Sequence, residues 1–215
     1  MEIHNKWGAG AVGLLLIENM TINDANALSQ AKRTLEASLR ERYGAIGRGE
    51  LKALHPMDVY VSYYKKFGYT YHVLPQLESV LRGKAIPDVL PPVEAMFMAE
   101  LKNGLLTAGH DMDRICLPLC FAVASQEAQY MTMGGREAAV VVGDAVAEDR
   151  EGVISSILRG PDRRTAITEG TRRVLYTVYA PAGIGTETVK AHLADMETYV
   201  RLFSKNAVAV LSEVL

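Results

Sequence analysis

The sequence predicts an α+β fold in which helices come first, a mostly antiparallel sheet follows, and a helix closes the chain. Three observations carry this prediction. Between about residues 24 and 104, apolar residues recur at helical spacing in segments that end at glycines. From about residue 105, short β-rich runs alternate with Gly, Asp and Pro clusters, and helical spacing returns over residues 186–215.

The first element expected is a strand at residues 10–18, a short apolar run between glycine and Asn19. An amphipathic helix follows Asn23-Asp24 and ends at Gly44, because apolar and charged side chains occupy opposite faces of this segment. Three further helices are predicted, each stopped by a glycine as helix C-termini commonly are. They cover residues 56–66, 75–82 and 92–102.

Four strands are expected in the second half of the chain, at residues 115–124, 138–142, 152–159 and 174–179, before a last helix over residues 186–215. If residues 152–179 form a hairpin, five arginines gather near its connection. The sequence contains no repeat and no linker long enough to divide it. A single domain spanning residues 1–215 is therefore expected.

Composition limits the functions that the chain can have. Of its 215 residues, 49% are hydrophobic and 22% charged, which is typical of a globular protein. The formal charge of −2 argues against DNA or RNA binding through bulk electrostatics, although a local basic patch stays possible. No apolar run approaches the roughly 20 residues of a membrane span, and the N-terminus does not resemble a secretory signal. We expect no membrane partner and a cytoplasmic location.

Metal and cofactor binding have little support. Cys116 and Cys120 lie in an apolar stretch with the wrong spacing for a zinc ribbon, and are interpreted as buried thiols. The run from His110 to Asp113 places an imidazole beside two carboxylates, which suits a metal site or an acid–base pair. No second His or Cys cluster accompanies it, so neither metal nor cofactor is expected, and Asp111 is interpreted as a turn former.

Two clusters remain open to more than one interpretation. Five of the ten tyrosines lie between residues 60 and 71 beside Lys65 and Lys66, and could stack bases and hold phosphates. The alternative is a half-buried helix whose rings pack while the hydroxyls reach water. A cationic, hydroxyl-rich segment at residues 159–173 suits a phosphate or a carboxylate, or is a solvated turn paired with Asp162 and Glu169.

The run from Val93 to Ile115 resembles a motif of the B3/B4 domain of the bacterial phenylalanyl-tRNA synthetase beta subunit, and aligns with it without a gap. The family motif reads V-D-x-T-N-Y-V-x-x-E-L-G-x-P-x-H-A-F-D-x-D-K-[IL]. Residues 140–144 resemble its [IL]-V-I-x-D strand, and residues 165–176 its S-x-V-x-x-x-T-x-N-[VI]-L segment. The similarity covers about residues 45–180.

The resemblance is closer still to free-standing members of the family. They share a Tyr-Lys-x-Phe-Gly helix end, here residues 64–68, and an arginine before a Thr-x-Ile-Thr segment, here Arg164 before residues 165–168. The resemblance implies a domain that, inside the synthetase, hydrolyses tyrosine wrongly attached to the tRNA for phenylalanine. Such a reaction needs positioned donors around the ester carbonyl and a held terminal adenosine.

Three positions depart from the family pattern. The family's histidine falls on Ala108, its asparagine on Phe97, and the acid that reads the tyrosine hydroxyl on Arg163. His110 replaces the missing imidazole only if the loop shifts by two residues. Because an arginine prefers an anionic group to a phenol, tyrosine specificity is not carried over.

The leading hypothesis is a free-standing B3/B4-like protein that binds tRNA and hydrolyses a mischarged aminoacyl-tRNA in trans. Its alternative is a non-catalytic module that binds RNA or a small anionic ligand at the same pocket, so enzyme activity is left open. The candidate catalytic residues are His110, Thr165 and Thr168. The candidate substrate-binding residues are Arg159, Arg163, Arg164 and Asn103.

Overall fold

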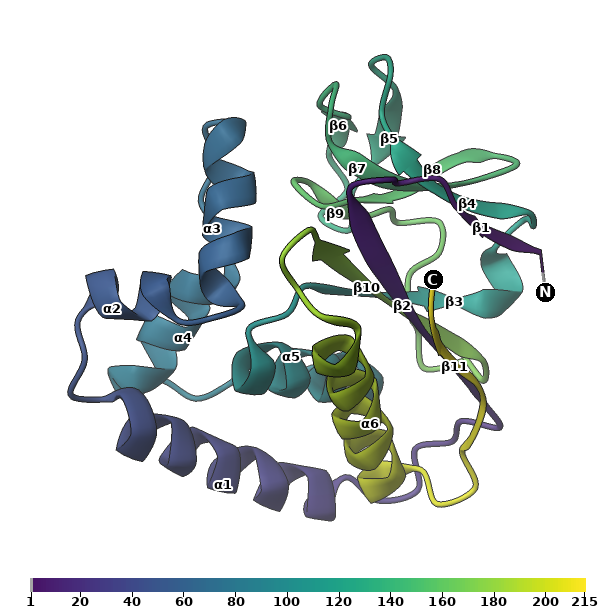
Figure 1. The fold of residues 1–215 in the computed structure, drawn as a ribbon. Helices are drawn as coiled ribbons and strands as arrows, with labels where there is room; N and C mark the ends of the chain where they lie inside the picture. Colours follow the sequence, from purple (N-terminus) through teal and green to yellow (C-terminus); the bar gives the residue numbers. More distant parts are fainter. Residues whose placement is uncertain (1) are drawn as a thin grey trace.

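In the computed structural model, which describes residues 2–215, a group of helices lies beside two larger β-sheets (Figure 1). The predicted α+β fold is confirmed. The helices are α1 (Asn26–Tyr43), α2 (Arg48–Ala53), α3 (Met57–Lys66), α4 (Val73–Leu81), α5 (Pro91–Asn103) and α6 (Thr186–Phe203), with a short 3-10 helix η1 at Met112–Arg114.

The first sheet is antiparallel and has the strand order β11-β2-β10-β3. Its strands are β2 (Gly10–Glu18), β3 (Thr107–Asp111), β10 (Val174–Pro181) and β11 (Val208–Val214). The second sheet has the order β1-β4-β7-β8-β9, with β1 (Ile3–Asn5), β4 (Leu119–Val123), β7 (Ala145–Asp149), β8 (Gly152–Ser156) and β9 (Gly160–Pro161). Strands β5 (Gln129–Met131) and β6 (Glu137–Ala139) form a separate hairpin. The β1–β4 pair is parallel and the other pairs are antiparallel, so the mostly antiparallel arrangement is confirmed.

Helices α1, α3, α4 and α5 begin and end close to the predicted positions, whereas the short helix α2 was not predicted. Three of them stop where glycine adopts a positive φ, at Gly68 (76°), Gly83 (96°) and Gly104 (70°). This left-handed conformation costs glycine little, because it has no Cβ. The apolar face of α1, which includes Leu28 and Leu35, is buried in the main core.

Helices α5 and α6 cover one face of the first sheet. On that face, a Cβ added to Gly13 would lie 2.5 Å from Val189 Cγ1 of α6, so only glycine permits this approach of helix to strand. The opposite face meets the second sheet through Tyr179, whose ring lies 5.8 Å from that of Phe121 in an edge-on arrangement. The Tyr179 hydroxyl also contacts Ser155 Oγ on β8. The first sheet is thus the middle layer of the molecule.

Two predictions about the second half are wrong, and one strand was missed. Residues 186–215 form helix α6 and then strand β11, which pairs with β2, instead of one helix. Residues 152–179 do not form a hairpin, because β8 belongs to the second sheet and β10 to the first. Residues 107–111, where no strand was predicted, form strand β3 at the edge of the first sheet. In addition, the expected strands at 115–124, 138–142 and 152–159 are shorter, as β4, β6 and β8.

The tyrosine cluster is part of the core. Tyr60, Tyr63, Tyr64 and Tyr71 are buried, and the Tyr60 and Tyr71 rings stack at 4.5 Å. Their hydroxyls do not reach water as expected, because each bonds inside the protein: Tyr63 to Asp144 at 2.8 Å and Tyr64 to Ile157 O at 2.6 Å. Burial raises the pKa of all four hydroxyls. These four rings are therefore closed to base stacking.

Both cysteines are free, and each is only partly buried, so the prediction of two buried thiols is wrong. Cys116 precedes β4 and donates its thiol to Glu151 Oε1 at 3.3 Å. The expected turn role of Asp111 is confirmed, since its carboxylate accepts the Asp113 N–H at 3.1 Å at the start of η1.

Candidate functional site

Two of the predicted catalytic residues lie together in the interior. His110 on β3 is fully buried, and its Nδ1 lies 2.8 Å from Thr165 Oγ1. The Thr165 hydroxyl in turn donates to Asp162 Oδ1. Because the Thr165 proton goes to the carboxylate, His110 Nδ1 carries a proton and Nε2 is left as a buried atom without a hydrogen-bond partner. Burial lowers the pKa of His110 to about 4, with a smaller contribution from the Arg164 charge, so the ring is neutral.

Arg164 closes this cluster as a structural ion pair. Its guanidinium binds Asp149 through two hydrogen bonds of 2.8 and 3.0 Å and lies 3.5 Å from Asp162 and 3.3 Å from Glu151. It also donates to Arg114 O at 2.9 Å. The pKa of Asp149 is lowered, because hydrogen bonds from Arg164 and two backbone N–H groups outweigh its burial. Arg164 therefore joins β7 to the loop after β9.

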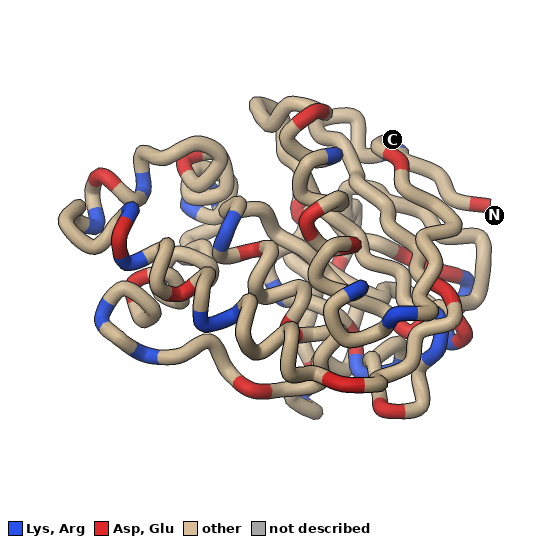
Figure 2. The backbone as a smooth tube through the Cα atoms, turned by 90° about the horizontal axis from the view of Figure 1, so that it is seen from below, with Lys and Arg blue, Asp and Glu red and all other residues tan. Residues whose placement is uncertain are grey.

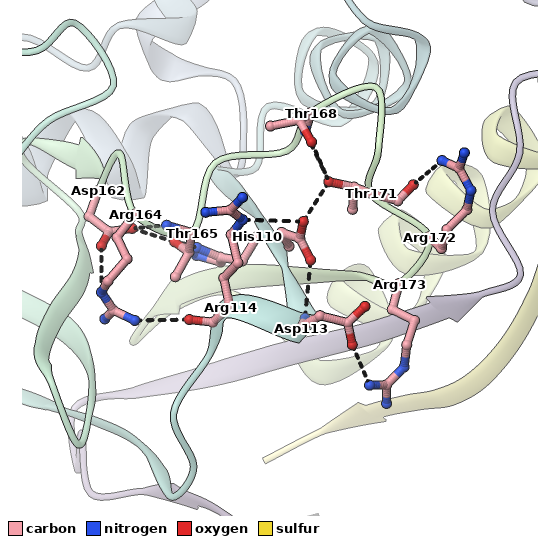
Figure 3. Close-up of polar contacts among 11 residues, drawn as sticks. His110, Asp113, Arg114, Asp162, Arg164, Thr165, Thr168, Thr171, Arg172 and Arg173 are labelled. Atoms are coloured by element: carbon pink, nitrogen blue, oxygen red, sulfur yellow. Dashed lines mark hydrogen bonds and ion pairs between the residues drawn. The ribbon is translucent and has the colours of Figure 1, made fainter.

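The arginines do not converge on one point, since the hairpin expected to gather them is absent. Arg172 bonds to carbonyl oxygens of its own loop, and Arg173 binds Glu18 at 2.9 Å and Asp113 at 2.7 Å. Figure 3 shows the guanidinium groups of Arg164, Arg172 and Arg173 directed to separate partners. Arg163 is exposed, and Arg159 lies over the Tyr69 ring at 4.9 Å. The third predicted catalytic residue, Thr168, is exposed and contacts Thr171 Oγ1 at 3.3 Å.

A cavity of about 290 Å³ lies at the β3 edge of the first sheet, and no side chain of this cluster lines it. Helix α5, strand β3 and strand β9 wall it, and Met133 of the β5–β6 connection reaches its rim. Most of the wall is apolar. It is lined by His72, Val93, Met96, Phe97, Glu100, Leu106, Thr107, Ala108, Gly109, Met133, Ser156, Gly160, Pro161, Ile167 and Tyr179.

None of the seven predicted site residues lines this cavity. Arg159, His110 and Thr168 are each next to a lining residue in the chain, and Arg159 is exposed in the β8–β9 turn. Two family positions do line it, namely Phe97 and Ala108, where the resemblance puts the synthetase's asparagine and histidine. The alignment and the polar motifs thus indicate two different places on the molecule.

Glu100 is the functional candidate that the sequence did not single out. Its side chain is 1% exposed, and its Oε1 accepts the Thr107 N–H at 2.8 Å. Burial raises its pKa to about 8, although the hydrogen bond from Thr107 opposes this shift. A carboxyl with a pKa near neutrality in an apolar cavity is a frequent feature of functional sites. The sequence feature that could have revealed Glu100 is a glutamate among the mostly apolar buried residues of α5.

A second cavity of about 480 Å³ adjoins the first, and the two share His72 and Phe97 in their walls. It lies between α4, α5 and the segment at 84–87, and Gln76, Ser79 and Lys84 give it a polar side. The two cavities therefore lie next to each other beside α5.

Within residues 2–215, no group of three or more His, Cys, Asp or Glu side chains is arranged to hold a metal ion. The same part of the chain has no helix that is both long and apolar enough to cross a bilayer.

The arrangement of sheets and helices is similar to that in part of a tRNA synthetase subunit. Its structure is similar to an N-terminal fragment of the phenylalanyl-tRNA synthetase beta-subunit from Pyrococcus horikoshii, with a TM-score of 0.54 and 13% sequence identity. The match covers 94% of this chain and 48% of the fragment, so this chain spans about half its length. At this identity the likeness shows the fold alone. No family model and no curated protein matches the sequence.

Proposed function

We propose that this chain binds the acceptor end of a tRNA, takes the attached amino acid into the 290 Å³ cavity, and hydrolyses the ester of a mischarged aminoacyl-tRNA in trans. The observation that carries this proposal is the position of the cavity. It lies in a fold similar to that of a synthetase fragment, at Phe97 and Ala108, where the sequence resemblance puts the asparagine and histidine of the B3/B4 motif. Fold likeness alone does not fix function, so the site must support it.

The cavity suits the end of an aminoacyl-tRNA in size and in chemistry. Its apolar wall, with Val93, Met96 and Ile167, fits an apolar amino-acid side chain. The adjoining cavity of about 480 Å³ has room for the terminal adenosine, and Lys84 at its edge supplies a cation for phosphate. Because no side chain aligned with the synthetase acid lines the pocket, we expect no preference for tyrosine.

Charge distribution favours RNA as the partner of the helical segment, residues 26–84. This segment holds 10 of the 23 Lys and Arg residues but only 5 of the 25 Asp and Glu residues, which leaves a charge of +5 on it and −7 on the rest. Lysine and arginine recur along these helices in Figure 2. Within residues 2–215, seven of the ten form no ion pair: Arg33, Arg42, Lys52, Lys65, Lys66, Arg82 and Lys84. Phosphate neutralisation needs such a basic face.

One observation favours the second candidate, a non-catalytic RNA-binding module. His110, Thr165 and Thr168, the predicted catalytic groups, lie outside the cavity, and His110 is closed off from solvent. Hydrolysis therefore depends on Glu100 and on backbone groups of β3. The two candidates share the cavity and the basic segment and differ in turnover.

The test is deacylation of a panel of mischarged tRNAs by the full chain, with Val93→Trp as the variant that fills the cavity. Val210→Trp, on the exposed side of β11, is the matched control. Turnover of one substrate that Val93→Trp loses and Val210→Trp keeps supports editing. Binding of tRNA without turnover supports the second candidate, and neither binding nor turnover would refute both.

A charge-reversal pair tests the basic segment separately. Lys65→Glu with Lys66→Glu changes two exposed cations at the end of α3, whereas Lys6→Glu with Lys205→Glu makes the same change elsewhere. We expect the first pair to weaken tRNA binding by tenfold or more and to reduce the slope of log K against log salt by roughly 1 to 2. The second pair should leave both quantities unchanged.

A further inference from the structure

A chain of buried hydrogen bonds runs from α6 to the wall of the cavity. His192 on α6 is fully buried, and its Nε2 lies 2.8 Å from Thr107 Oγ1. On the other side of the ring, Asn103 Nδ2 lies 3.2 Å from His192 Nδ1 and 2.9 Å from Asp195 Oδ2. Lys102 pairs with the second oxygen of Asp195 at 2.6 Å. The predicted substrate residue Asn103 therefore contacts a histidine of the core.

The partners fix where the protons lie. A carboxylate only accepts, so the Asn103 nitrogen donates to Asp195, and the same amide donates its second proton to His192 Nδ1. Burial lowers the pKa of His192 to about 4, so the ring is neutral and its single proton is on Nε2. That proton is donated to Thr107 Oγ1. The Thr107 hydroxyl proton is left for an acceptor in the cavity that Thr107 lines.

A backbone donor lies beside this hydroxyl. Strand β3 is an edge strand, and its residues 107 and 111 turn their N–H groups away from β10, to Glu100 and to Thr165 O at 2.8 Å. Orientation alternates along an antiparallel strand, so Gly109 between them turns its N–H the same way, toward the cavity. A Cβ on Gly109 would lie 2.8 Å from Ile167 Cδ1, so glycine is also required there for space.

The third donor is the carboxyl group of Glu100. Its Oε1 is occupied by the Thr107 N–H, which leaves Oε2 toward the apolar interior of the cavity. In its protonated form, which the raised pKa near 8 makes the main form at neutral pH, this carboxyl donates an O–H bond. The largely apolar wall of the cavity thus contains three hydrogen-bond donors, from Thr107, Gly109 and Glu100.

We propose that Thr107 Oγ1, Gly109 N and the Glu100 carboxyl form a binding site for the carbonyl oxygen of an acyl group, and that His192 is a positioning residue that keeps Thr107 a donor. This inference rests on the proposed function, in which the carbonyl belongs to the ester of an aminoacyl-tRNA. Buried donors without a partner are costly, so an acceptor of this kind is favoured in the cavity.

The site would act as an oxyanion hole during hydrolysis. A water oxygen adds to the carbonyl carbon, and the C=O electron pair moves to the oxygen, where the three donors stabilise the negative charge. When the carbonyl re-forms, the bond to the ribose oxygen breaks. The proton lost by the water ends on that ribose oxygen, which gives the free amino acid and the tRNA hydroxyl.

The experiment measures binding of two probes by calorimetry. One is 3′-deoxy-3′-(L-phenylalanylamino)adenosine, a stable amide, and the other is its (E)-alkene isostere, which has the same shape without the carbonyl. We expect the wild type to bind the amide at least tenfold more tightly. Thr107→Val and His192→Phe should remove most of this preference and leave alkene binding unchanged. Thr107→Ser and His192→Gln, which restores an N–H at the Nε2 position, should retain it.

The outcomes separate this proposal from the proposed function. Equal affinity of the wild type for the two probes would refute the carbonyl site while leaving the cavity as the amino-acid site. Binding of neither probe would refute the proposed function and the carbonyl site with it. An unchanged preference in a folded Thr107→Val protein would also refute the carbonyl site, whether or not His192→Phe folds.

Discussion

The cluster around His110 and the cavity around Glu100 lie on the same edge strand, yet they differ in how their polar groups are satisfied. In the cluster, Arg164 binds three carboxylates and Thr165 links His110 to Asp162. In the cavity, polar groups are few and the wall between them is apolar. The many polar groups of the cluster bind one another and have a structural role. The few polar groups of the cavity are available to bind a ligand.

This difference shows why charged residues close in sequence were a poor guide to the site. Arg164 is held by carboxylates of β7 and of its own loop, and such pairs offer little to a ligand. Polar groups that face an apolar cavity form strong hydrogen bonds with a ligand, because little water competes with the ligand there. The comparison can be tested by variants that change one region at a time.

The largest effect is expected for Glu100→Gln. In the folded protein the pKa of Glu100 is about 8, above the ordinary 4.5, so its stabilising contribution is full below pH 4.5 and is lost as the pH rises through 8. Between pH 5 and 8.5, wild-type unfolding free energy should fall by about 4 kcal/mol relative to the variant. The hydroxyls of Tyr60, Tyr64 and Tyr71, which interact with the Glu100 charge, stay protonated in this range because burial raises their pKa. His72 lines the cavity, and burial lowers its pKa in both proteins.

Urea unfolding at a series of pH values measures this difference. A curve for Glu100→Gln that runs parallel to the wild type would show that Glu100 ionises normally, and the distinction between the cavity and the cluster would fail. Gln is a suitable replacement because its Oε1 still accepts the Thr107 N–H.

For the cluster, His110→Asn should have the opposite dependence on pH. The pKa of His110 is lowered to about 4 from 6.5, so its contribution is present above pH 6.5 and is lost as the pH falls through 4. The asparagine amide can donate to Thr165 as Nδ1 does and does not titrate. The wild type should lose about 3 kcal/mol more than the variant between pH 7 and 4. Thermal unfolding over this range checks the difference, and equal losses would contradict it.

Arg164→Ala should destabilise the fold by about 2 kcal/mol. Removal of the guanidinium leaves Asp149 and Asp162 buried without their cation, although partial exposure of Arg164 lets water replace part of the interaction. Arg172→Ala, which loses bonds to backbone carbonyls at the surface, should change stability by less than about 0.5 kcal/mol. A stable Arg164→Ala protein that no longer binds tRNA would indicate that the tRNA-binding site is the cluster around His110 and not the cavity.

The smallest effect is expected for Thr168→Ala. Thr168 is exposed and its hydroxyl contacts Thr171 at the long distance of 3.3 Å, so stability should change by less than about 0.5 kcal/mol. Any deacylation rate should change by less than threefold. A hundredfold loss of rate in the folded variant would support the sequence-based prediction that Thr168 is catalytic.

Local pattern explains which parts of the fold could be predicted. The apolar periodicity of α1, α3, α4 and α5 and the glycines that end them are encoded within a few residues, and the structure confirms them. Strand β11 was missed because Val208 and Val210 are exposed while alternate residues pack, a weak signal beside the strong helix before it. The alternation of β3 is likewise hidden by Gly109 and His110.

The candidate site depended on contacts between residues far apart in the chain. The sequence by itself determined helices α1, α3, α4 and α5, the order of helical and β-rich regions, and the gapless match that includes Phe97 and Ala108. Only the tertiary structure decided that the Arg164 guanidinium pairs with Asp149 and that His192 Nε2 lies 2.8 Å from Thr107 Oγ1. It also decided that Glu100 is buried beside β3. The reason is physical: hydrogen bonding within an element is local, whereas burial and the pKa values it sets depend on which distant segments pack together.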